Sequence, residues 1–322
     1  MMNWKFWLGI LISITFLYLS FRKVEFREVI EALRDANYFY LLPTLIAIFL
    51  GFLFRVYRWR YLLLPTKKVG IASLFSATMI GFMANNILPA RMGEVIKVYF
   101  LGRRENISKS LAFATVVLER IFDMLIILLF LAVILIISPF PDWVRKAGYF
   151  TTAVYLVTVI CLVGLKLQSA RVVGIIQRCL FFLPKRISER IIALLWSFVE
   201  GLNVLGKPKY VLMVIFYSLL LWIVSGLTFY FVLFSFGINL PVYVSFFVMI
   251  ITALGIAVPS APGFIGNFQF FCITALAIFG VEKNIALSYS ILIHAVGFIP
   301  VTLAGFIYLC KENVSLAKLS RE

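Results

Sequence analysis

The stretch GFMANNILPARMGE, residues 81–94, interrupts an apolar segment where a membrane-spanning helix would continue. About thirty residues later, LERIFDML (118–125) places three charges at the start of another long apolar run. An isolated charge at mid-bilayer costs about 2.5–3.5 kcal/mol on insertion scales, so charges are tolerated there where they pair with each other or line a water-filled path. In or directly beside these two segments lie three basic and three acidic side chains, which are Arg91, Glu94, Lys97, Glu119, Arg120 and Asp123.

The composition around these breaks predicts the fold class. Of the 322 residues, 63% are hydrophobic and 14% are charged, and the mean hydropathy is +1.05. Several apolar runs approach or exceed the roughly 20 residues that a spanning helix needs. A barrel would instead show short alternating segments. We therefore expect an all-α, polytopic helical membrane protein that forms one integral membrane domain over residues 1–322.

The excess of positive charge also has a membrane explanation. The net charge is +16, but the basic residues cluster in loops between apolar runs, and no nucleic-acid-binding motif occurs. This distribution fits the positive-inside rule and contact with anionic lipid headgroups. The four cysteines are scattered without a CxxC pair, and there is one histidine. The sequence thus predicts neither a metal site nor a cofactor.

Charge asymmetry predicts the topology. Most of the 30 lysines and arginines fall in segments that we assign to the cytoplasm, together with both termini, in a protein of the cytoplasmic membrane. Arg55, Arg58 and Arg60 after the second span mark one such segment. The basic loop 166–209 is the largest, and within it we expect interfacial helices. The six predicted full spans are residues 6–20, 38–54, 112–138, 149–165, 210–236 and 285–309.

Two further apolar segments are predicted to be re-entrant hairpins, residues 71–101 and 242–280. The first has cytoplasmic charge on both flanks, so it cannot be one simple crossing, and the second enters from the opposite side. Each contains a Pro-x-x-x-Gly motif, at Pro89 to Gly93 and at Pro259 to Gly263. Paired broken helices of opposite orientation are typical of inverted-topology repeats, which build a site near the bilayer midplane. The sequence therefore predicts a possible inverted repeat.

The charged residues near the first break and in the LERIFDML segment are the candidate site. Glu119 and Asp123 share a helix face at i and i+4, and Arg120 lies toward the same side. They either form a structural buried salt bridge or face a neighbouring helix that carries Arg91, Glu94 or Lys97. Arg91 follows the break closely enough to attract an anionic headgroup to exposed half-helix amides. Lys97 has the alternative of extending to the interface.

Polar side chains at both breaks complete the candidate set. Asn85 and Asn86 can cap half-helices or bind a polar ligand, with capping the favoured role. At the second break Asn267 and Gln269 are the nearest polar side chains. His294, deep in the last span, either bonds a neighbouring helix or couples to protons. The residues that shape the second break are Pro259, Pro262, Gly263 and Gly266.

Three segments together resemble the lysylphosphatidylglycerol synthase transmembrane region family, also called flippase-like domain proteins. They are NNILPARMGEVIKVYFL (85–101), VVLERIFDML (116–125) and VPSAPGFIGNFQ (258–269), and the resemblance extends over nearly the whole chain. It implies that Arg91, Glu94, Glu119, Arg120 and Asp123 are charged motif positions. It also implies a second Pro-Gly motif at Pro262, Gly263 and Gly266. Gln269 departs from the family, which often has Glu at this place.

The resemblance implies lipid translocation, since the family domain is understood as the lipid-moving part of aminoacyl-phospholipid synthases. We expect a flippase or scramblase for a phospholipid or a polyprenyl-phosphate-type lipid. Without the soluble synthase domain, this chain is not expected to make aminoacyl lipids, and no hydrolase, phosphate-loop or dinucleotide motif predicts an enzyme. The alternatives are a secondary transporter of a small polar solute and a non-transporting partner of a lipid-synthesis enzyme or glycosyltransferase. The sequence does not determine the lipid, the direction of movement or the oligomeric state.

Overall fold

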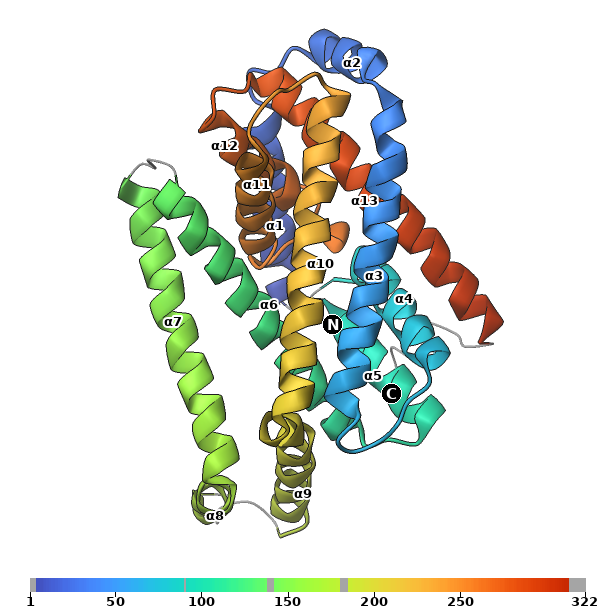
Figure 1. Cartoon of the computed structure of the whole chain (residues 1–322), viewed down its shortest axis with the longest axis vertical. Helices are drawn as coiled ribbons and strands as arrows, with labels where there is room; N and C mark the ends of the chain where they lie inside the picture. The colour runs from blue at the N-terminus through green and yellow to red at the C-terminus, as the bar shows by residue number, and fades with distance from the viewer. Residues whose placement is uncertain (1–3, 90, 138–141, 180–184, 313–322) are drawn as a thin grey trace. The chain divides into compact units, whose positions relative to one another are not determined.

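The computed structural model describes residues 4–89, 91–137, 142–179 and 185–312, and within these ranges it contains helices and turns but no β-strand (Figure 1). The chain forms two compact units. Unit 1 comprises residues 1–53, 78–97 and 220–322, and unit 2 comprises residues 54–77 and 98–219. Four helices contribute residues to both units, namely α3 (Leu41–Leu63), α4 (Ile71–Ile87), α5 (Met92–Glu105) and α10 (Pro208–Ser235).

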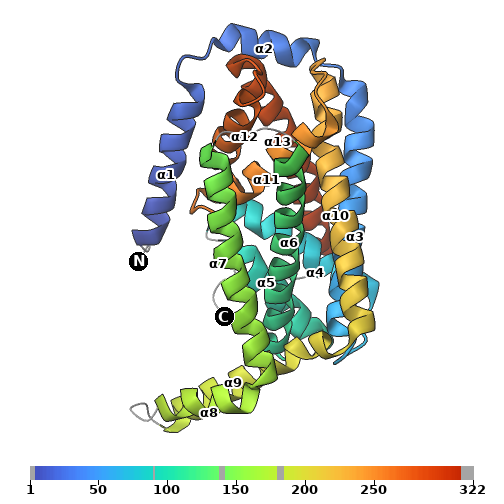
Figure 2. The ribbon, with the colours of Figure 1, turned by 60° about the vertical axis from the view of Figure 1, so that its left-hand side comes forward.

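Unit 1 contains both predicted helix breaks. Its other helices are α1 (Trp4–Phe21), α2 (Phe26–Asp35), η1 (Tyr38–Tyr40), α11 (Val242–Gly255), η4 (Pro262–Phe264), α12 (Asn267–Ala277) and α13 (Lys283–Lys311). Helix α12 packs against α1, α11 and α13, and α2 packs against α13 (Figure 2). The α2–α13 contact is polar, because Asn284 of α13 accepts a hydrogen bond from the Glu25 amide at 3.2 Å and donates to the Glu28 carboxylate at 2.5 Å.

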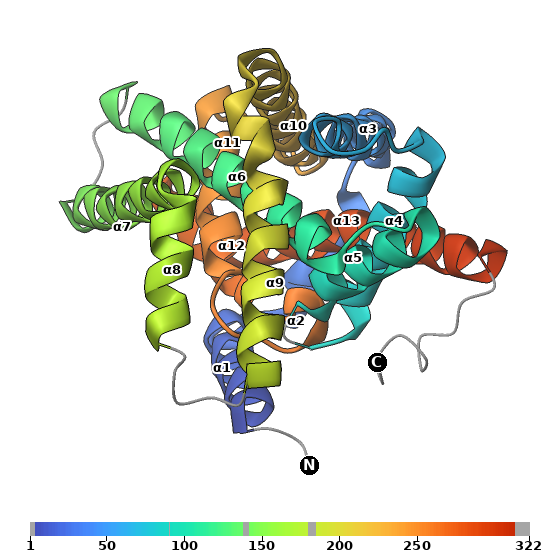
Figure 3. The same cartoon turned by 90° about the horizontal axis from the view of Figure 1, so that it is seen from below.

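Unit 2 is built around α6 (Lys109–Ile137), which packs against α7 (Asp142–Leu167) and α9 (Lys185–Gly201). The shorter α8 (Ser169–Cys179) lies beside α9, as Figure 3 shows, and η3 (Leu202–Gly206) leads to α10. The predicted 166–209 segment is thus largely helical. Exposed apolar side chains on α8 and α9 accompany basic ones, a composition that suits the membrane surface. The exposed apolar side chains include Ile175, Leu194 and Trp196.

The described residues fit a polytopic helical membrane protein. Four helices are long and apolar enough to cross a membrane, and they correspond to the second, third, fifth and sixth predicted spans. The first and fourth predicted spans correspond to α1, of 18 residues, and α7, of 26 residues. The faces of α6 also differ, because the apolar Phe113 and Leu125 are 44% and 37% exposed, whereas Glu119 between them is 1% exposed. Membrane proteins face apolar residues outward and keep ionisable ones inside.

The second span is longer than predicted. We expected it to end at Phe54 and its following arginines to lie in a loop, but α3 continues to Leu63. No glycine or proline occurs between Gly51 and Pro65, and Pro65, together with its effect on the preceding residue, ends the helix. Arg58 is therefore a helical residue, and it is fully buried.

Both predicted breaks are present, with different conformations. Helix α4 ends at Ile87 and α5 begins at Met92, and α11 ends at Gly255 and α12 begins at Asn267. At the first break Arg91 adopts the left-handed conformation, with φ of 54°, whereas at the second Gly263 does so, with φ of 68°. Gly93 instead permits a close helix approach, since a Cβ there would lie 1.9 Å from the Gly81 carbonyl oxygen. The two Pro-x-x-x-Gly motifs are therefore not conformationally equivalent, and the inverted repeat stays a prediction.

The contact between α4 and α13 in unit 1 depends on a glycine. A Cβ at Gly305 would lie 2.2 Å from the Met83 Cβ and 2.7 Å from the Met79 carbonyl oxygen. We expect Gly305→Ala to lower the thermal unfolding midpoint of the purified protein, because overpacking of this kind typically costs about 1–3 kcal/mol. Gly297→Ala on the same helix is the control, since a Cβ there meets nothing within 4 Å. Equal midpoints for the two variants would contradict this close packing.

Candidate functional site

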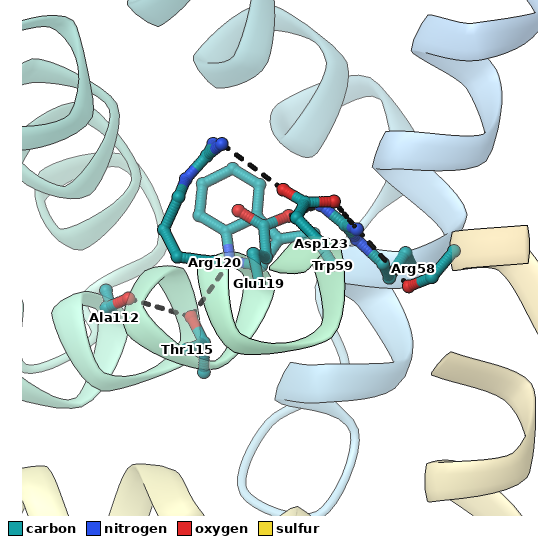
Figure 4. Close-up of polar contacts among 8 residues, drawn as sticks. Arg58, Trp59, Ala112, Thr115, Glu119, Arg120 and Asp123 are labelled. Carbon is teal, nitrogen blue, oxygen red and sulfur yellow. Dashed lines mark hydrogen bonds and ion pairs between the residues drawn. The ribbon is translucent and has the colours of Figure 1, made fainter. Parts of the chain in front are cut away.

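The charged residues of α6 meet an arginine of α3 inside unit 2. Arg58 and Trp59 extend from α3 toward the α6 turn that carries Thr115, Glu119 and Asp123 (Figure 4). The Arg58 Nη1 lies 2.5 Å from Asp123 Oδ1, and its Nη2 lies 3.4 Å from Oδ2, so the guanidinium contacts both carboxylate oxygens. The same Nη2 lies 3.7 Å from Glu119 Oε1. One buried guanidinium thus contacts two buried carboxylates.

Further polar contacts hold this cluster in place. Arg120 donates to Asp123 Oδ2 at 3.2 Å, and its side chain is 38% exposed. Arg58 also donates to the Ser218 hydroxyl of α10 at 3.2 Å. The Trp59 indole donates to Thr115 Oγ1 at 2.9 Å, and Thr115 in turn donates to the Ala112 carbonyl at 2.7 Å. Arg58, Arg120, Glu119 and Asp123 carry two charges of each sign and balance one another.

Burial makes these pairs strongly interdependent. Arg58, Glu119 and Asp123 are each at most 3% exposed, so none of them relies on bulk water to stabilise its charge. Breaking a buried ion pair by removing one partner typically costs about 3–5 kcal/mol, because the other charge is left buried. A buried pair is not by itself evidence of high stability, since an apolar pair of equal volume is often as stable. The geometry thus accommodates either the structural salt bridge or a polar path.

The first break in unit 1 is organised by its two asparagines. The Asn85 side-chain oxygen accepts a hydrogen bond from the Gly93 amide at 2.8 Å, which is the capping contact expected of it. Asn86 instead donates to Thr302 Oγ1 at 2.8 Å and ties the end of α4 to α13. Lys97 is only 5% exposed, so its side chain is buried within the protein.

Arg91 joins the first break to the second. Its Nη2 donates to the Ile256 carbonyl at the end of α11, at 2.8 Å, and its guanidinium carbon lies 5.6 Å from the centre of the Phe264 ring. A cation at a helix C-terminus is favoured by the helix dipole. Gly263 completes the contact, because a Cβ there would lie 3.2 Å from the Asn86 carbonyl oxygen. The two predicted breaks, which the sequence alone did not bring together, therefore meet in unit 1.

The second break is enclosed by α1 and α13. Ser13 of α1 accepts from the Ala261 amide at 2.7 Å and donates to Asn267 Oδ1 at 3.4 Å. Asn267 is fully buried and also donates to the Val258 carbonyl. Gln269, at 7% exposure, accepts from the Gly266 amide at 2.9 Å and lies 2.8 Å from His294 Nδ1. Both side chains thus hold the backbone of the break.

The predicted site residues therefore fall into two groups. Glu119, Arg120 and Asp123 belong to unit 2, whereas the residues of the two breaks belong to unit 1. The latter are Asn85, Asn86, Arg91, Glu94, Lys97, Asn267 and Gln269. Glu94 is half-buried in the first turn of α5, where its amide donates to the Arg91 carbonyl at 3.1 Å.

The sequence analysis missed Arg58 as a partner of the carboxylates. Its cluster with Arg55 and Arg60 indicated a cytoplasmic loop. The signal that could have found it is the absence of glycine and proline between Gly51 and Pro65, which places Arg58 one turn after Arg55 on a continuing helix. Arg55 lies within electrostatic range of Asp123 and Glu119 as well.

The Arg58–Asp123 pair generates a stability prediction. Each single variant, Arg58→Met and Asp123→Leu, is expected to lose about 3–5 kcal/mol, because it leaves a buried charge with its main partner removed. The double variant is expected to recover part of this loss, as measured by thermal or denaturant unfolding in detergent. Arg27→Ala, which removes an exposed pair with Glu31, is the control and should change little. Strictly additive losses in the double variant would contradict the coupling.

Comparison with known proteins places these features in a family. The family model described as the lysylphosphatidylglycerol synthase TM region matches residues 6–305. No solved structure matches the chain. A UPF0104 membrane protein of Methanocaldococcus jannaschii is 26% identical over 235 residues, which cover 71% of this chain and 95% of that protein.

Two further relatives cover more of the chain. A UPF0104 membrane protein of Methanothermobacter thermautotrophicus is 25% identical over 299 residues, which cover 86% of this chain and 87% of the relative. The protein named glycosyltransferase AglD of Haloferax volcanii is 27% identical, in an alignment that covers 98% of this chain and 55% of AglD. Because the family model spans both helix breaks and the α6 charges, the chain belongs to the lysylphosphatidylglycerol synthase TM region family.

Proposed function

We propose that this protein moves a lipid with a phosphate-bearing headgroup, a phospholipid or a polyprenyl-phosphate-type lipid, across the cytoplasmic membrane as a flippase or scramblase. Both termini would lie in the cytoplasm, as the distribution of basic residues predicts. The observation that carries the proposal is the contact between the two helix breaks through Arg91. Family membership supports it, because the family is named for the membrane part of a lipid-modifying enzyme.

The chemistry at the paired breaks suits a phosphate group. Arg91 directly precedes the start of α5 and contacts the Phe264 ring in the segment that leads to α12, and helix N-termini favour anions. Guanidinium is also the side chain best matched to phosphate oxygens. Non-helical backbone at membrane depth is tolerated where protein buries it or where it lines a water-filled cavity. A headgroup could therefore pass such a place while its acyl or prenyl tails stay in the lipid.

The buried cluster of unit 2 would serve this function by providing charged side chains in the interior of the protein. Its carboxylates are matched to Arg58 and Arg120, and rearrangement of such pairs can accommodate an amine or a sugar on a headgroup. The chain has no phosphate-binding loop that would couple movement to ATP. Movement would then be downhill or coupled to an ion.

A second candidate follows from the relative named glycosyltransferase AglD. This chain matches about half of AglD, so a membrane part of this kind occurs within a protein named as an enzyme. The alternative function is therefore a non-transporting membrane partner of a glycosyltransferase or lipid-synthesis enzyme, bound through the basic segment 166–209. It predicts that charges at the helix breaks do not affect the rate at which lipid crosses a bilayer.

The test is a lipid-movement assay on the reconstituted protein, with fluorescent phospholipid quenched from outside the vesicle. Arg91→Gln keeps a donor for the Ile256 carbonyl but removes the charge, and Arg91→Lys keeps the charge. We expect Gln to slow movement by about tenfold or more and Lys to retain most of it. A hydrogen bond to a charged group is worth about 1.5–3 kcal/mol, and about 1.4 kcal/mol corresponds to a factor of ten.

Arg103→Gln is the matched control, because Arg103 is an exposed arginine in the last turn of the same helix α5. It should leave the rate unchanged. The same assay with a labelled polyprenyl phosphate distinguishes the two lipid classes. Failure of the wild-type protein to move either lipid would refute the proposal and favour the partner function.

A further inference from the structure

Three hydrogen bonds in series connect two backbone groups of the second break. The Gly266 amide lies 2.9 Å from Gln269 Oε1, Gln269 Nε2 lies 2.8 Å from His294 Nδ1, and His294 Nε2 lies 2.9 Å from the Gly263 carbonyl oxygen. The series begins at a group that can only donate and ends at one that can only accept. The proton positions between them are therefore determined by the ends.

The direction of each bond follows step by step. Because the Gly266 amide donates, the Gln269 atom that faces it must be the oxygen, since the reversed amide would set N–H against N–H. The Gln269 nitrogen then faces His294 Nδ1, which must accept. Because the Gly263 carbonyl accepts, His294 Nε2 must carry the proton. The complete series is satisfied by a neutral imidazole protonated on Nε2, and a proton added to Nδ1 would oppose the Gln269 amide group.

The surroundings leave the imidazole little room to rearrange. The Phe268 ring stacks on it at 4.5 Å, and the Phe298 ring meets it edge-on at 5.9 Å. The backbone acceptor and donor are also fixed, because Gly263 and Gly266 have φ of 68° and 91°, which other residues rarely adopt. Rotation of the ring would thus break its hydrogen bond to the constrained Gly263 carbonyl and its hydrogen bond to Gln269.

The charges near this break also favour a neutral histidine. Arg91 contacts the Ile256 carbonyl and the Phe264 ring, so it brings a positive charge to the same loop. Helix α12 carries Cys272 as its titratable side chain, and the neighbouring turns of α13 carry Tyr289. Helix α1 contributes Ser13 at this place, and α4 contributes Asn86, whose side chains do not titrate. None of these groups supplies the negative charge that would stabilise an imidazolium.

We propose that Gln269 is a positioning residue that holds His294 as a neutral Nε2–H donor, so that the second break keeps its geometry without binding or releasing a proton at this histidine. Its consequence for transport rests on the proposed function: lipid movement would not be coupled to protons through His294. The statement about the tautomer stands independently of any transport. A glutamate at position 269 would have the opposite effect on His294. Its carboxylate cannot donate to Nδ1, so the hydrogen bond would require a proton on Nδ1.

His294 is the single histidine of the chain, so one isotope label reports on it alone. The experiment is nitrogen-15 NMR of the full-length protein in lipid nanodiscs, with histidine labelled at Nδ1. We expect Nδ1 to give the signal of an unprotonated nitrogen from about pH 8 to about pH 5.5, a range that spans the ordinary titration of histidine. A protonated Nδ1, or a signal that titrates within this range, would overturn the proposal.

Gln269→Glu is the matched variant, since it is nearly isosteric and can still accept from the Gly266 amide. We expect its Nδ1 signal to be of the protonated type over the same range. An unprotonated Nδ1 in this variant would also count against the proposed role of Gln269. Where the variant does not fold, the wild-type spectrum still decides the assignment.

The transport consequence is measured separately in the vesicle assay. We expect the wild-type rate at about pH 7.5 and at about pH 5.5 to agree within about twofold, a range over which a histidine in water would change its charge. The Gln269→Glu variant should also show no pH change of this size, because its Nδ1 is expected to stay protonated over the same range. A wild-type rate that changes tenfold between these pH values, together with an Nδ1 signal that titrates over the same range, would overturn the transport consequence. A wild-type protein that moves no lipid would refute the proposed function and leave the tautomer result to the spectrum.

Discussion

A break in a membrane-embedded helix leaves backbone N–H and C=O groups that hydrocarbon cannot satisfy, and the organisation of unit 1 follows from this constraint. Side chains supply most of the missing partners. Asn85 caps the start of α5, Gln269 accepts from the amide before α12, and Arg91 donates to the carbonyl at the end of α11. Each of these three partners comes from the chain itself. The polar residues near the breaks thus serve the fold first, and any transport role is added to that.

The two polar centres of the protein satisfy their groups in different ways. In unit 2 the buried groups are charged, and Arg58 is matched to Asp123 and Glu119. At the second break of unit 1 the groups are neutral. A series of hydrogen bonds there runs from the Gly266 amide through Gln269 and His294 to the Gly263 carbonyl. Charged pairs respond strongly to the loss of one partner, whereas a neutral series responds to the reversal of a single donor. The charged pairs of unit 2 therefore suit a site whose side chains exchange partners, and the neutral series of unit 1 suits a fixed support for the backbone.

Glycines decide how closely the helices approach. Gly93 allows α5 to contact α4, Gly305 allows α13 to contact α4, and Gly255 lies against the Phe271 ring. Between membrane helices there is no hydrophobic driving force, so close backbone approach and interhelical hydrogen bonds stabilise the contact instead. The hydrogen bond from Asn86 to Thr302 accordingly lies about one helical turn from the close contact at Gly305. Close backbone approach also explains why glycine and asparagine, rather than large apolar residues, mark the parts of the sequence that position the site.

The sequence by itself determined the helical membrane class, the two breaks and the α6 charges, because each depends on local features. Apolar length predicts spans, Pro89 and Pro262 disrupt helices locally, and a carboxylate in an apolar run is visible wherever it lies. Only the tertiary structure decided which groups pair. Nothing in the sequence around Arg58 names Asp123 as its partner, 65 residues away, or joins Arg91 to Ile256. Partner choice depends on which helix faces meet, and that is set by packing over the whole unit rather than by any local pattern.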